Sequence, residues 1–388
     1  MGKKVSAGIM IIMLLVFGCI RAPAEKPVYS PELPKVTSAF AIEGKPFRFL
    51  GAFTGGPWFL KGVPWQQELV VTAKEAGISV FHMMVPPFET ELGVYDEKGL
   101  TCFDLILDLA SKNGIYVTIE VIQGGQIALD EKNPYYHPGC MEGLIKDKRL
   151  KDAYKKRLEY LIMHRNSVNG RIYRDDSTIL AWVLIMEPFL TELPAGKHPV
   201  RPPKATRSEL RDWFQEMALY TKSLDPDSLV SVGFTEGTAC PSEHDWLVAF
   251  DVPALDFLYL EDADARILEL NEGMGPDPYP LKLFSLGKPV VIHLAFDNPY
   301  TWDFERIGTD YVWQANTLRE EAKKYFEVGA AGVTLVWSSA LGKEALKPYL
   351  SETDLLFYYD ATKKPIVTAM KEIAAEFDTL NPAPELQK

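Results

Sequence analysis

The stretch from Ile179 to Pro188 constrains the fold of this chain more than any other. It is an unbroken apolar run, from Ile179 to Met186, that ends in the carboxylate of Glu187. Such a run is typical of a strand buried on both faces, as in a parallel sheet covered by helices. Pro188 cannot donate a backbone hydrogen bond and ends the ladder. We therefore expect a strand over Ile179–Glu187, with Glu187 at its carboxyl end, where catalytic groups of parallel barrels are found.

Eight apolar segments of this kind alternate with helical patterns along the chain. This alternation predicts an α/β fold, a single (β/α)₈ TIM barrel, because consecutive parallel strands need a helical crossover between them. The expected strands are Phe47–Phe53, Ile78–Val85, Ile115–Ile122, Ile179–Glu187, Leu229–Gly233, Ala254–Leu260, Lys288–Leu294 and Gly332–Trp337.

Helices are expected between these strands, with recognisable ends. Thr101 is the predicted N-cap of a helix that stops at Gly114, and Thr206 with Glu209 forms a predicted capping box. The other expected helices are Trp65–Ala76, 147–166, His244–Phe250, Tyr311–Val328 and Ala361–Phe377. No repeat or internal linker divides the chain, so we expect one barrel domain over residues 37–378 and a tail over 379–388.

The first residues are predicted to be a targeting segment. Lys3 and Lys4 precede a short apolar run from Ala7 to Phe17, which is typical of a signal peptide over residues 1–18. Cys19 lies where a lipoprotein would be acylated, although cleavage without lipidation and an uncleaved anchor both remain open. Residues 19–36 are rich in proline and predict a tether. We therefore expect an extracellular protein held at a membrane by a lipid anchor.

Charge and cysteine content exclude several classes of function. The net charge is -12, and no basic stripe offsets it, so a nucleic-acid partner is not expected. No His and Cys spacing typical of zinc occurs, so we predict no metal site and no cofactor. Cys140 and Cys240 lie in segments predicted as loops and could pair in an oxidising compartment.

Several motifs together resemble one family. They include Arg165–Gly170, Tyr173–Trp182, the Glu187-Pro188 pair, Lys222–Pro226 and Lys288–Val291. On these motifs the chain resembles the glycoside hydrolases of family 5, and most closely their endo-β-1,4-mannanase branch, over most of residues 45–340. The resemblance implies a TIM barrel, and a neutral β-linked polysaccharide or oligosaccharide of the mannan or glucan type as the partner.

The resemblance also implies two catalytic glutamates, of which one has no counterpart here. Glu187 corresponds to the general acid/base that ends the fourth strand. The nucleophile should end the seventh strand, where this chain has His293 and Leu294. A retaining glycosidase needs the second carboxylate about 5 Å from the first, and neither side chain can form the glycosyl ester.

Other positions of the family pattern have changed with the nucleophile. Phe53 stands near the Asn that ends the first strand in the family, His82 stands at the usual Arg, and Met186 at the usual Asn. After the sixth strand the chain has Glu261, which we predict as a tentative second catalytic carboxylate. Alternatively, Glu261 belongs to an acidic run exposed to solvent, or Glu236 or Glu120 supplies the second carboxylate.

Four further residues are predicted to contact substrate. Trp337 corresponds to a sugar platform of the family, and Trp58 is a loop aromatic; for each, packing is the alternative. His82 and His293 are expected at the same end of the barrel, either near substrate or as two neutral, hydrogen-bonded histidines.

Three functions are consistent with these features. The first is a glycoside hydrolase with Glu187 as acid/base. The second is a catalytically inactive barrel that binds carbohydrate at the cell surface. The third is a scaffold without a ligand, with a cleft filled by Met186, Phe53 and Leu294.

Overall fold

The computed structural model describes most of the expected barrel. The described residues are 40–42, 44–54, 63–188, 205–235, 247–261, 286–294, 310–327, 329–338, 359–360 and 363–380. The predicted signal peptide, the tether with Cys19, and Trp58 and Glu236 lie outside them. Within the described residues, no helix has the length and apolarity needed to cross a membrane.

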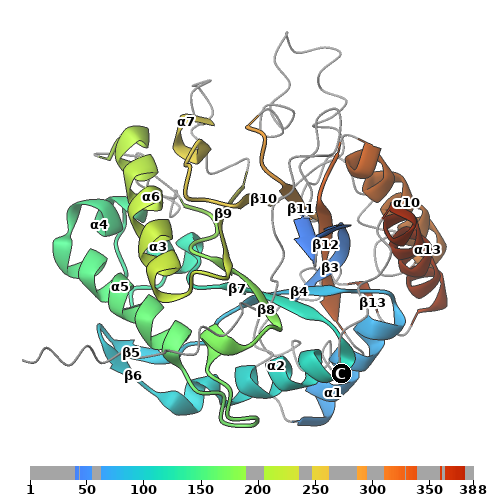
Figure 1. Ribbon diagram of the computed structural model, residues 1–388, viewed down its shortest axis with the longest axis horizontal. Coiled ribbons are helices and arrows are strands. Elements are labelled where there is room, and N and C mark those ends of the chain that lie inside the picture. Colours follow the sequence, from blue (N-terminus) through green and yellow to red (C-terminus); the bar gives the residue numbers. More distant parts are fainter. Residues whose placement is uncertain are drawn as a thin grey trace, which may run out of the picture.

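Eight parallel strands close into a barrel, as the sequence predicts (Figure 1). The order around the barrel is β3, β4, β7, β8, β9, β10, β11 and β12, and β12 pairs with both β11 and β3. These strands are β3 Phe49–Phe53, β4 Val80–Met84, β7 Tyr116–Glu120, β8 Ile179–Val183, β9 Leu229–Thr235, β10 Phe257–Glu261, β11 Val290–Leu294 and β12 Gly332–Ser338.

Short strands lie outside the closed ring. Two antiparallel pairs, β1 with β2 and β5 with β6, form small separate sheets, and β13 extends the barrel sheet beside β12. Their bounds are β1 Phe40–Ile42, β2 Lys45–Phe47, β5 Glu89–Glu91, β6 Val94–Tyr95 and β13 Tyr359–Asp360.

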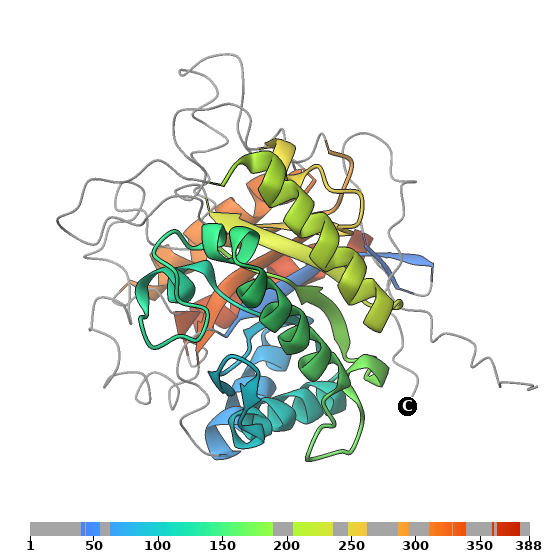
Figure 2. The same ribbon diagram turned by 90° about the vertical axis from the view of Figure 1, so that its left-hand side faces the viewer.

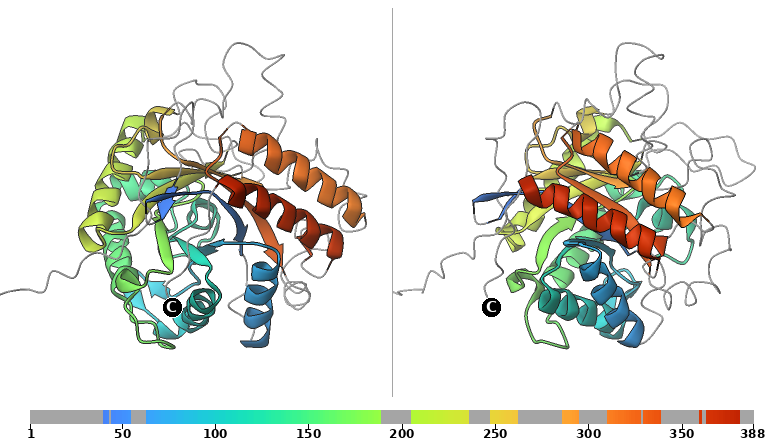
Figure 3. Two further views of the ribbon diagram at one scale, coloured as in Figure 1. Left: turned by 45° about the vertical axis from the view of Figure 1, so that its right-hand side comes forward. Right: turned by 90° about the vertical axis from the view of Figure 1, so that its right-hand side faces the viewer.

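Helices surround the barrel. On one side of the barrel, α5 and α6 cover the strands (Figure 2). On the other side, α10 and α13 lie next to each other (Figure 3). The helices are α1 Val63–Glu75, α2 Thr101–Asn113, α3 Gly124–Leu129, α4 Met141–Lys146, α5 Lys148–Met163, α6 Arg207–Leu224, α7 Leu247–Phe250, α10 Tyr311–Glu327 and α13 Lys364–Leu380, with the 3-10 helices η2 Glu97–Leu100 and η3 Tyr173–Asp175.

The predicted helix ends are confirmed in two places and wrong in one. Thr206 and Glu209 form both hydrogen bonds of the capping box at the start of α6. Gly114 ends α2 in the left-handed conformation, with a φ of 66°. Thr101 is not an N-cap, because η2 runs directly into α2; Asp96 instead caps η2 by accepting from the Lys98 amide.

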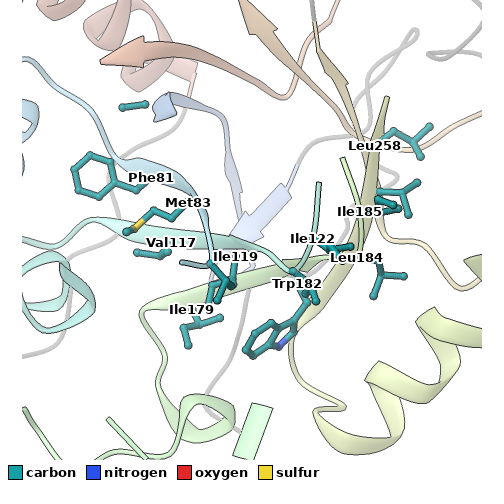
Figure 4. Packing of buried hydrophobic residues seen from close by; sticks show 14 of the residues in the cluster. Phe81, Met83, Val117, Ile119, Ile122, Ile179, Trp182, Leu184, Ile185 and Leu258 are labelled. Carbon is teal, nitrogen blue, oxygen red and sulfur yellow. The ribbon is translucent and has the colours of Figure 1, made fainter. Parts of the chain in front are cut away.

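The core has two layers, one inside the barrel and one between the barrel and the helices. The outer layer takes alternate residues of the strands, including Phe81, Val117, Ile119 and Trp182 (Figure 4). The inner layer fills the barrel and includes Phe49 and Phe40, the latter from the β1–β2 pair.

Glycines make room for the large side chains of the inner layer. A Cβ on Gly332 would lie 2.5 Å from the Phe49 ring, and a Cβ on Gly233 would lie 2.0 Å from the Met186 sulfur. Since atoms cannot approach so closely, Phe49 and Met186 occupy the space that a side chain at either glycine would need. The barrel interior is therefore a packed core.

Candidate active site at the carboxyl ends of the strands

Glu187 lies beyond the carboxyl end of β8. The expected strand over Ile179–Glu187 is too long, because β8 ends at Val183. The chain nevertheless stays bonded on both sides: the Leu184 amide donates to the Ser231 carbonyl of β9 at 2.8 Å, and the Met186 amide donates to the carbonyl of Ile122, just after β7, at 3.2 Å. Glu187 therefore follows a bonded segment, and its position at this end of the barrel agrees with the sequence prediction.

The backbone of Glu187 is held in an unusual conformation against Gly124 and Gly125. Its φ is 52°, in the left-handed region that a residue with a Cβ rarely adopts. A Cβ on Gly124 would lie 1.7 Å from the Glu187 carbonyl oxygen, and a Cβ on Gly125 would lie 2.8 Å from its carboxylate Oε2. The two glycines thus allow the chain after β7 to approach Glu187, whose side chain is half-buried.

A polar cluster lies deeper, inside the barrel. His82 Nδ1 and Tyr259 Oη lie 3.0 and 3.1 Å from Thr118 Oγ1. Since Thr118 on β7 and Tyr259 on β10 are not on neighbouring strands, this second bond crosses the interior of the barrel. On its other side, His82 Nε2 lies 3.3 Å from Glu120 Oε2, but the alignment is too poor for a hydrogen bond.

Burial keeps this cluster uncharged at neutral pH. Glu120 and His82 are each 1% exposed. Desolvation raises the pKa of Glu120 to about 8 and lowers the pKa of His82 to about 3. Glu120 is therefore a neutral acid and His82 a neutral imidazole near pH 7. Glu120 Oε1 and His82 Nε2 have no hydrogen-bond partner in the part of the chain that the structure describes.

His293 lies near His82, as expected, and Phe53 packs against both. The Phe53 ring centroid is 5.4 Å from that of His82 and 5.0 Å from that of His293. His293 Nδ1 lies 2.9 Å from Thr334 Oγ1. Burial, and then the nearby His82, lower the pKa of His293 to about 3. This geometry favours two neutral histidines within the barrel; their predicted contact with substrate stays a prediction.

The strand that should carry the nucleophile ends in two buried side chains. His293 is 3% exposed and Leu294 1% exposed. In the adjacent strand, the backbone of Glu261 pairs with that of His293 on one side and that of Thr235 on the other. Glu261 therefore occupies the neighbouring strand end, as predicted, and the position of its carboxylate lies outside the described part of the structure.

Trp337, one of the two predicted sugar platforms, is buried. Trp337 is 1% exposed and belongs to the outer core layer, between the barrel and the helices. This burial favours its packing role over the platform role. Trp58 and Glu236 lie outside the described residues. Cys140 is buried, with its Sγ 3.5 Å from the Gly124 carbonyl oxygen, and its predicted partner Cys240 is not described.

Sequence reasoning missed the carboxyl group that lies beside His82. It placed Glu120 near a strand end but did not pair it with the histidine. A signal was present: Tyr116, Thr118 and Glu120 alternate with apolar residues in a strand that was expected to be buried on both faces. Alternate residues of a strand share a face, so a polar set in a barrel strand predicts polar groups inside the barrel.

The motif that resembles family 5 most strongly lies at the opposite end of β8. Asp104 accepts hydrogen bonds there from Tyr173 Oη at 2.6 Å and Ser167 Oγ at 2.6 Å, and His164 Nε2 lies 3.0 Å away. Burial acts to raise the pKa of Asp104, but these hydrogen bonds outweigh it and the pKa lies below its usual value. The motif therefore supports the barrel from its amino-terminal end, where similarity indicates stability and not chemistry.

Metal ligation has no support in the described residues, in which no group of three or more His, Cys, Asp or Glu side chains could hold an ion. The prediction that the chain needs no metal stays a prediction.

Comparisons with known proteins find the same resemblance. Residues 138–259 match the model of GH family 5 beta-mannosidase-like proteins. The chain is 31% identical over 159 residues to mannan endo-1,4-beta-mannosidase 2 of Oryza sativa subsp. japonica, covering 39% of this chain and 33% of that protein. It is 26% identical over 211 residues to mannan endo-1,4-beta-mannosidase 5 of Solanum lycopersicum, covering 50% and 48%. The chain thus spans between a third and a half of the length of these relatives.

Solved structures extend the likeness over the whole barrel. The endo-1,4-beta-mannanase from Rhizomucor miehei superposes with a TM-score of 0.64 at 17% identity, covering 88% of this chain and 98% of that one. The endo-beta-1,4-mannanase from Thermotoga petrophila gives 0.63 at 19% identity, covering 89% and 79%. The fold is thus that of the family 5 barrels, and the resemblance of this chain to the mannanase-like glycoside hydrolases of family 5 is confirmed.

Proposed function

We propose that this chain is a glycoside hydrolase-like protein that acts on a neutral β-linked polysaccharide of the mannan type, with Glu187 as its general acid/base. The position of Glu187 carries the proposal. Glu187 is half-buried and lies beyond the carboxyl end of β8. Its backbone has a φ of 52° and lies against Gly124 and Gly125 of the segment after β7. Strained backbone of this kind is concentrated at functional sites. The names of the relatives, which are mannan endo-1,4-beta-mannosidases, support the substrate class.

The chemistry requires a second carboxylate. Glu187 would donate its proton to the glycosidic oxygen as the bond to the anomeric carbon breaks. His293 and Leu294 cannot serve as the nucleophile of a retaining mechanism. Glu261, whose backbone lies beside His293, is our candidate for the base that activates a water molecule. That inverting mechanism needs the two carboxyls roughly 6.5–9.5 Å apart, with room for the water between them.

Hydrolysis tests this proposal directly. Reducing-sugar release is measured from mannan, glucomannan and cellulose for the parent protein, Glu187→Gln and Glu261→Gln. Glu91→Gln is the control, because it makes the same change at an exposed position. Activity that is lost in the first two variants and kept in the control supports two carboxylates. Activity that persists in Glu187→Gln refutes the assignment of Glu187.

Carbohydrate binding without hydrolysis is the second candidate, and the strand ends favour it. Where the family pattern has a charged Arg and a carboxylate, this chain has His82 and the His293-Leu294 pair, which are buried. Glu120 is a carboxyl group inside the barrel, but it is also buried and neutral. Binding of manno-oligosaccharides measured by calorimetry, with no reducing sugar released, would establish this function and refute hydrolysis.

Export to the cell surface is part of the proposal. The predicted signal peptide and Cys19 support it, since an enzyme that degrades polysaccharide must meet a polymer too large to enter the cell. A Cys19→Ala variant should move from the membrane fraction to the soluble fraction. Unchanged fractionation would refute lipidation at this residue.

A further inference from the structure

We propose that Tyr154 and Arg157 of α5 are positioning residues that hold Glu187 against Gly124 and Gly125. This inference rests on the proposed role of Glu187. The two side chains are three residues apart and so share one face of the helix. Both are buried, and each donates hydrogen bonds to a backbone carbonyl at the end of a barrel strand.

The first contact is to the segment that carries Glu187. Tyr154 is fully buried, and its hydroxyl donates to the Leu184 carbonyl at 2.5 Å. Leu184 is the first residue after β8. Burial raises the pKa of Tyr154, so the hydroxyl keeps its proton and stays a donor. Since Pro188 follows Glu187 and cannot donate, this bond to Leu184 is one of those that hold the segment before it in place.

The second contact is to the segment that carries the two glycines. Arg157 Nε and Nη2 donate to the Val121 carbonyl at 3.2 and 3.1 Å. Val121 is the first residue after β7, the strand next to β8. The same guanidinium donates through Nη1 to Glu89 Oε2 at 3.0 Å, which neutralises its buried charge.

We call the contacts of Tyr154 with the Leu184 carbonyl and of Arg157 with the Val121 carbonyl the clamp. Glu89 connects Arg157 to the surrounding loops. Its Oε1 accepts from the Gly93 amide at 2.7 Å and from the Tyr135 hydroxyl at 3.2 Å. The Arg157 guanidinium also lies over the Phe88 ring, 4.3 Å from its centroid. Arg157 is therefore fixed on several sides, and it can act as a rigid support for the end of β7.

The two held carbonyls are the same distance in sequence from the site. Gly124 follows Val121 by three residues, and Glu187 follows Leu184 by three residues. The two segments meet there: the Gly124 amide donates to the Met186 carbonyl at 2.8 Å, and a Cβ on Gly124 would lie 1.7 Å from the Glu187 carbonyl oxygen. Because this approach leaves no space, a shift of either segment moves the Glu187 carboxyl.

A pair of tyrosine variants tests the clamp. Tyr154→Phe removes only the hydroxyl that donates to Leu184. Tyr173→Phe is the matched control, because Tyr173 is equally buried and its hydroxyl donates to Asp104 at 2.6 Å, at the other end of β8. Each variant loses one buried hydrogen bond, so a general loss of stability would affect both.

Two measurements separate positioning from stability. We expect Tyr154→Phe to lower kcat on mannan by at least about tenfold with KM changed by less than about twofold, because a displaced catalytic group mainly costs turnover. We also expect faster hydrogen exchange at the Gly124 amide in ¹⁵N-glycine-labelled protein. Tyr173→Phe should change neither. Equal behaviour of the two variants in both measurements would overturn the clamp.

The exchange measurement also separates failure of this inference from failure of the proposed function. If the parent protein releases no sugar, the proposed hydrolysis fails, while the Gly124 amide still reports on the clamp. Faster exchange at Gly124 in Tyr154→Phe alone would then support it, and equal exchange in the two variants would overturn it. Arg157→Lys keeps a cation opposite Glu89 but loses the two donors to Val121. It should accelerate exchange at Gly124 as well, and unchanged exchange would refute the part assigned to Arg157.

Discussion

The free energy of unfolding of this protein should fall as the pH rises above 6.5, and replacing Glu120 with glutamine should remove this fall. Burial raises the pKa of Glu120 from 4.5 to about 8. The folded protein therefore holds a proton that the unfolded chain has released between these two pH values. The stability associated with this group is fully present below pH 4.5 and is lost as the pH rises towards 8.

The size of the effect follows from the shift. One pKa unit corresponds to about 1.4 kcal/mol, so Glu120 should reduce the free energy of unfolding by roughly 4 to 5 kcal/mol across this window. His82 and His293 act in the opposite direction. Burial lowers each pKa from 6.5 to about 3, so the stability linked to them is present above pH 6.5 and lost on acidification.

The three groups together predict a stability maximum near pH 6.5. Between pH 6.5 and 8, Glu120 is the one group of the three whose protonation differs between the folded and the unfolded chain. The free energy of unfolding should therefore fall by about 1.4 kcal/mol per pH unit as the pH rises. Below pH 6.5 the two histidines outweigh the one carboxyl, so stability should also fall with decreasing pH. Glu120→Gln should therefore leave an acid limb, which becomes steeper, and a flat region above pH 6.5.

Urea denaturation followed by tryptophan fluorescence, at half-unit steps from pH 5 to 9, measures this difference. Glu91→Gln, the same change at an exposed residue, should give a curve parallel to that of the parent protein. If the Glu120→Gln curve is also parallel to the parent curve above pH 6.5, the buried carboxyl is not neutral and the reasoning is refuted.

Three further substitutions test the packing around the site. Arg157→Met should destabilise the protein by about 3–5 kcal/mol in chemical denaturation, because it leaves Glu89 buried without its cation. Adding Glu89→Leu should recover much of this stability. Gly233→Ala would place a Cβ 2.0 Å from the Met186 sulfur and should cost about 1–3 kcal/mol in the same assay, with Met186→Ala restoring part of it. Gly124→Ala would place a Cβ 1.7 Å from a backbone carbonyl oxygen, so the melting temperature should fall and any hydrolytic activity should be lost; an unchanged melting temperature would contradict the close approach.

Much of the fold was predictable because it depends on local patterns. The apolar segments at Val80–Met84 and Val290–Leu294 are recognisable as buried strands from their composition and length. The capping box at Thr206 and the stop at Gly114 follow from interactions within one turn of helix. Thr101 was assigned wrongly because its local sequence resembles an N-cap, whereas the preceding 3-10 helix already supplies the helical turn.

The site was predictable only in part, since its residues come from different strands. The sequence placed Glu187 and His293 at one end of the barrel, because each lies at the end of an apolar segment, and it placed His82 there through the family resemblance. It did not predict that both histidines are buried, or that Glu120 lies 3.3 Å from His82. These facts depend on which side chains meet across the closed barrel.

The amino-acid sequence by itself determined the eight strands, the helices between them, and the absence of a carboxylate at the end of β11, since each of these depends on residue types along a short stretch. Only the tertiary structure decided the protonation of Glu120 and the conformation of Glu187. Closing the barrel removes water from Glu120 and shifts its proton equilibrium. The contact with Gly124, which is more than sixty residues away along the chain, holds the Glu187 backbone at a φ of 52°. Both effects arise from groups that become neighbours only when the chain is folded.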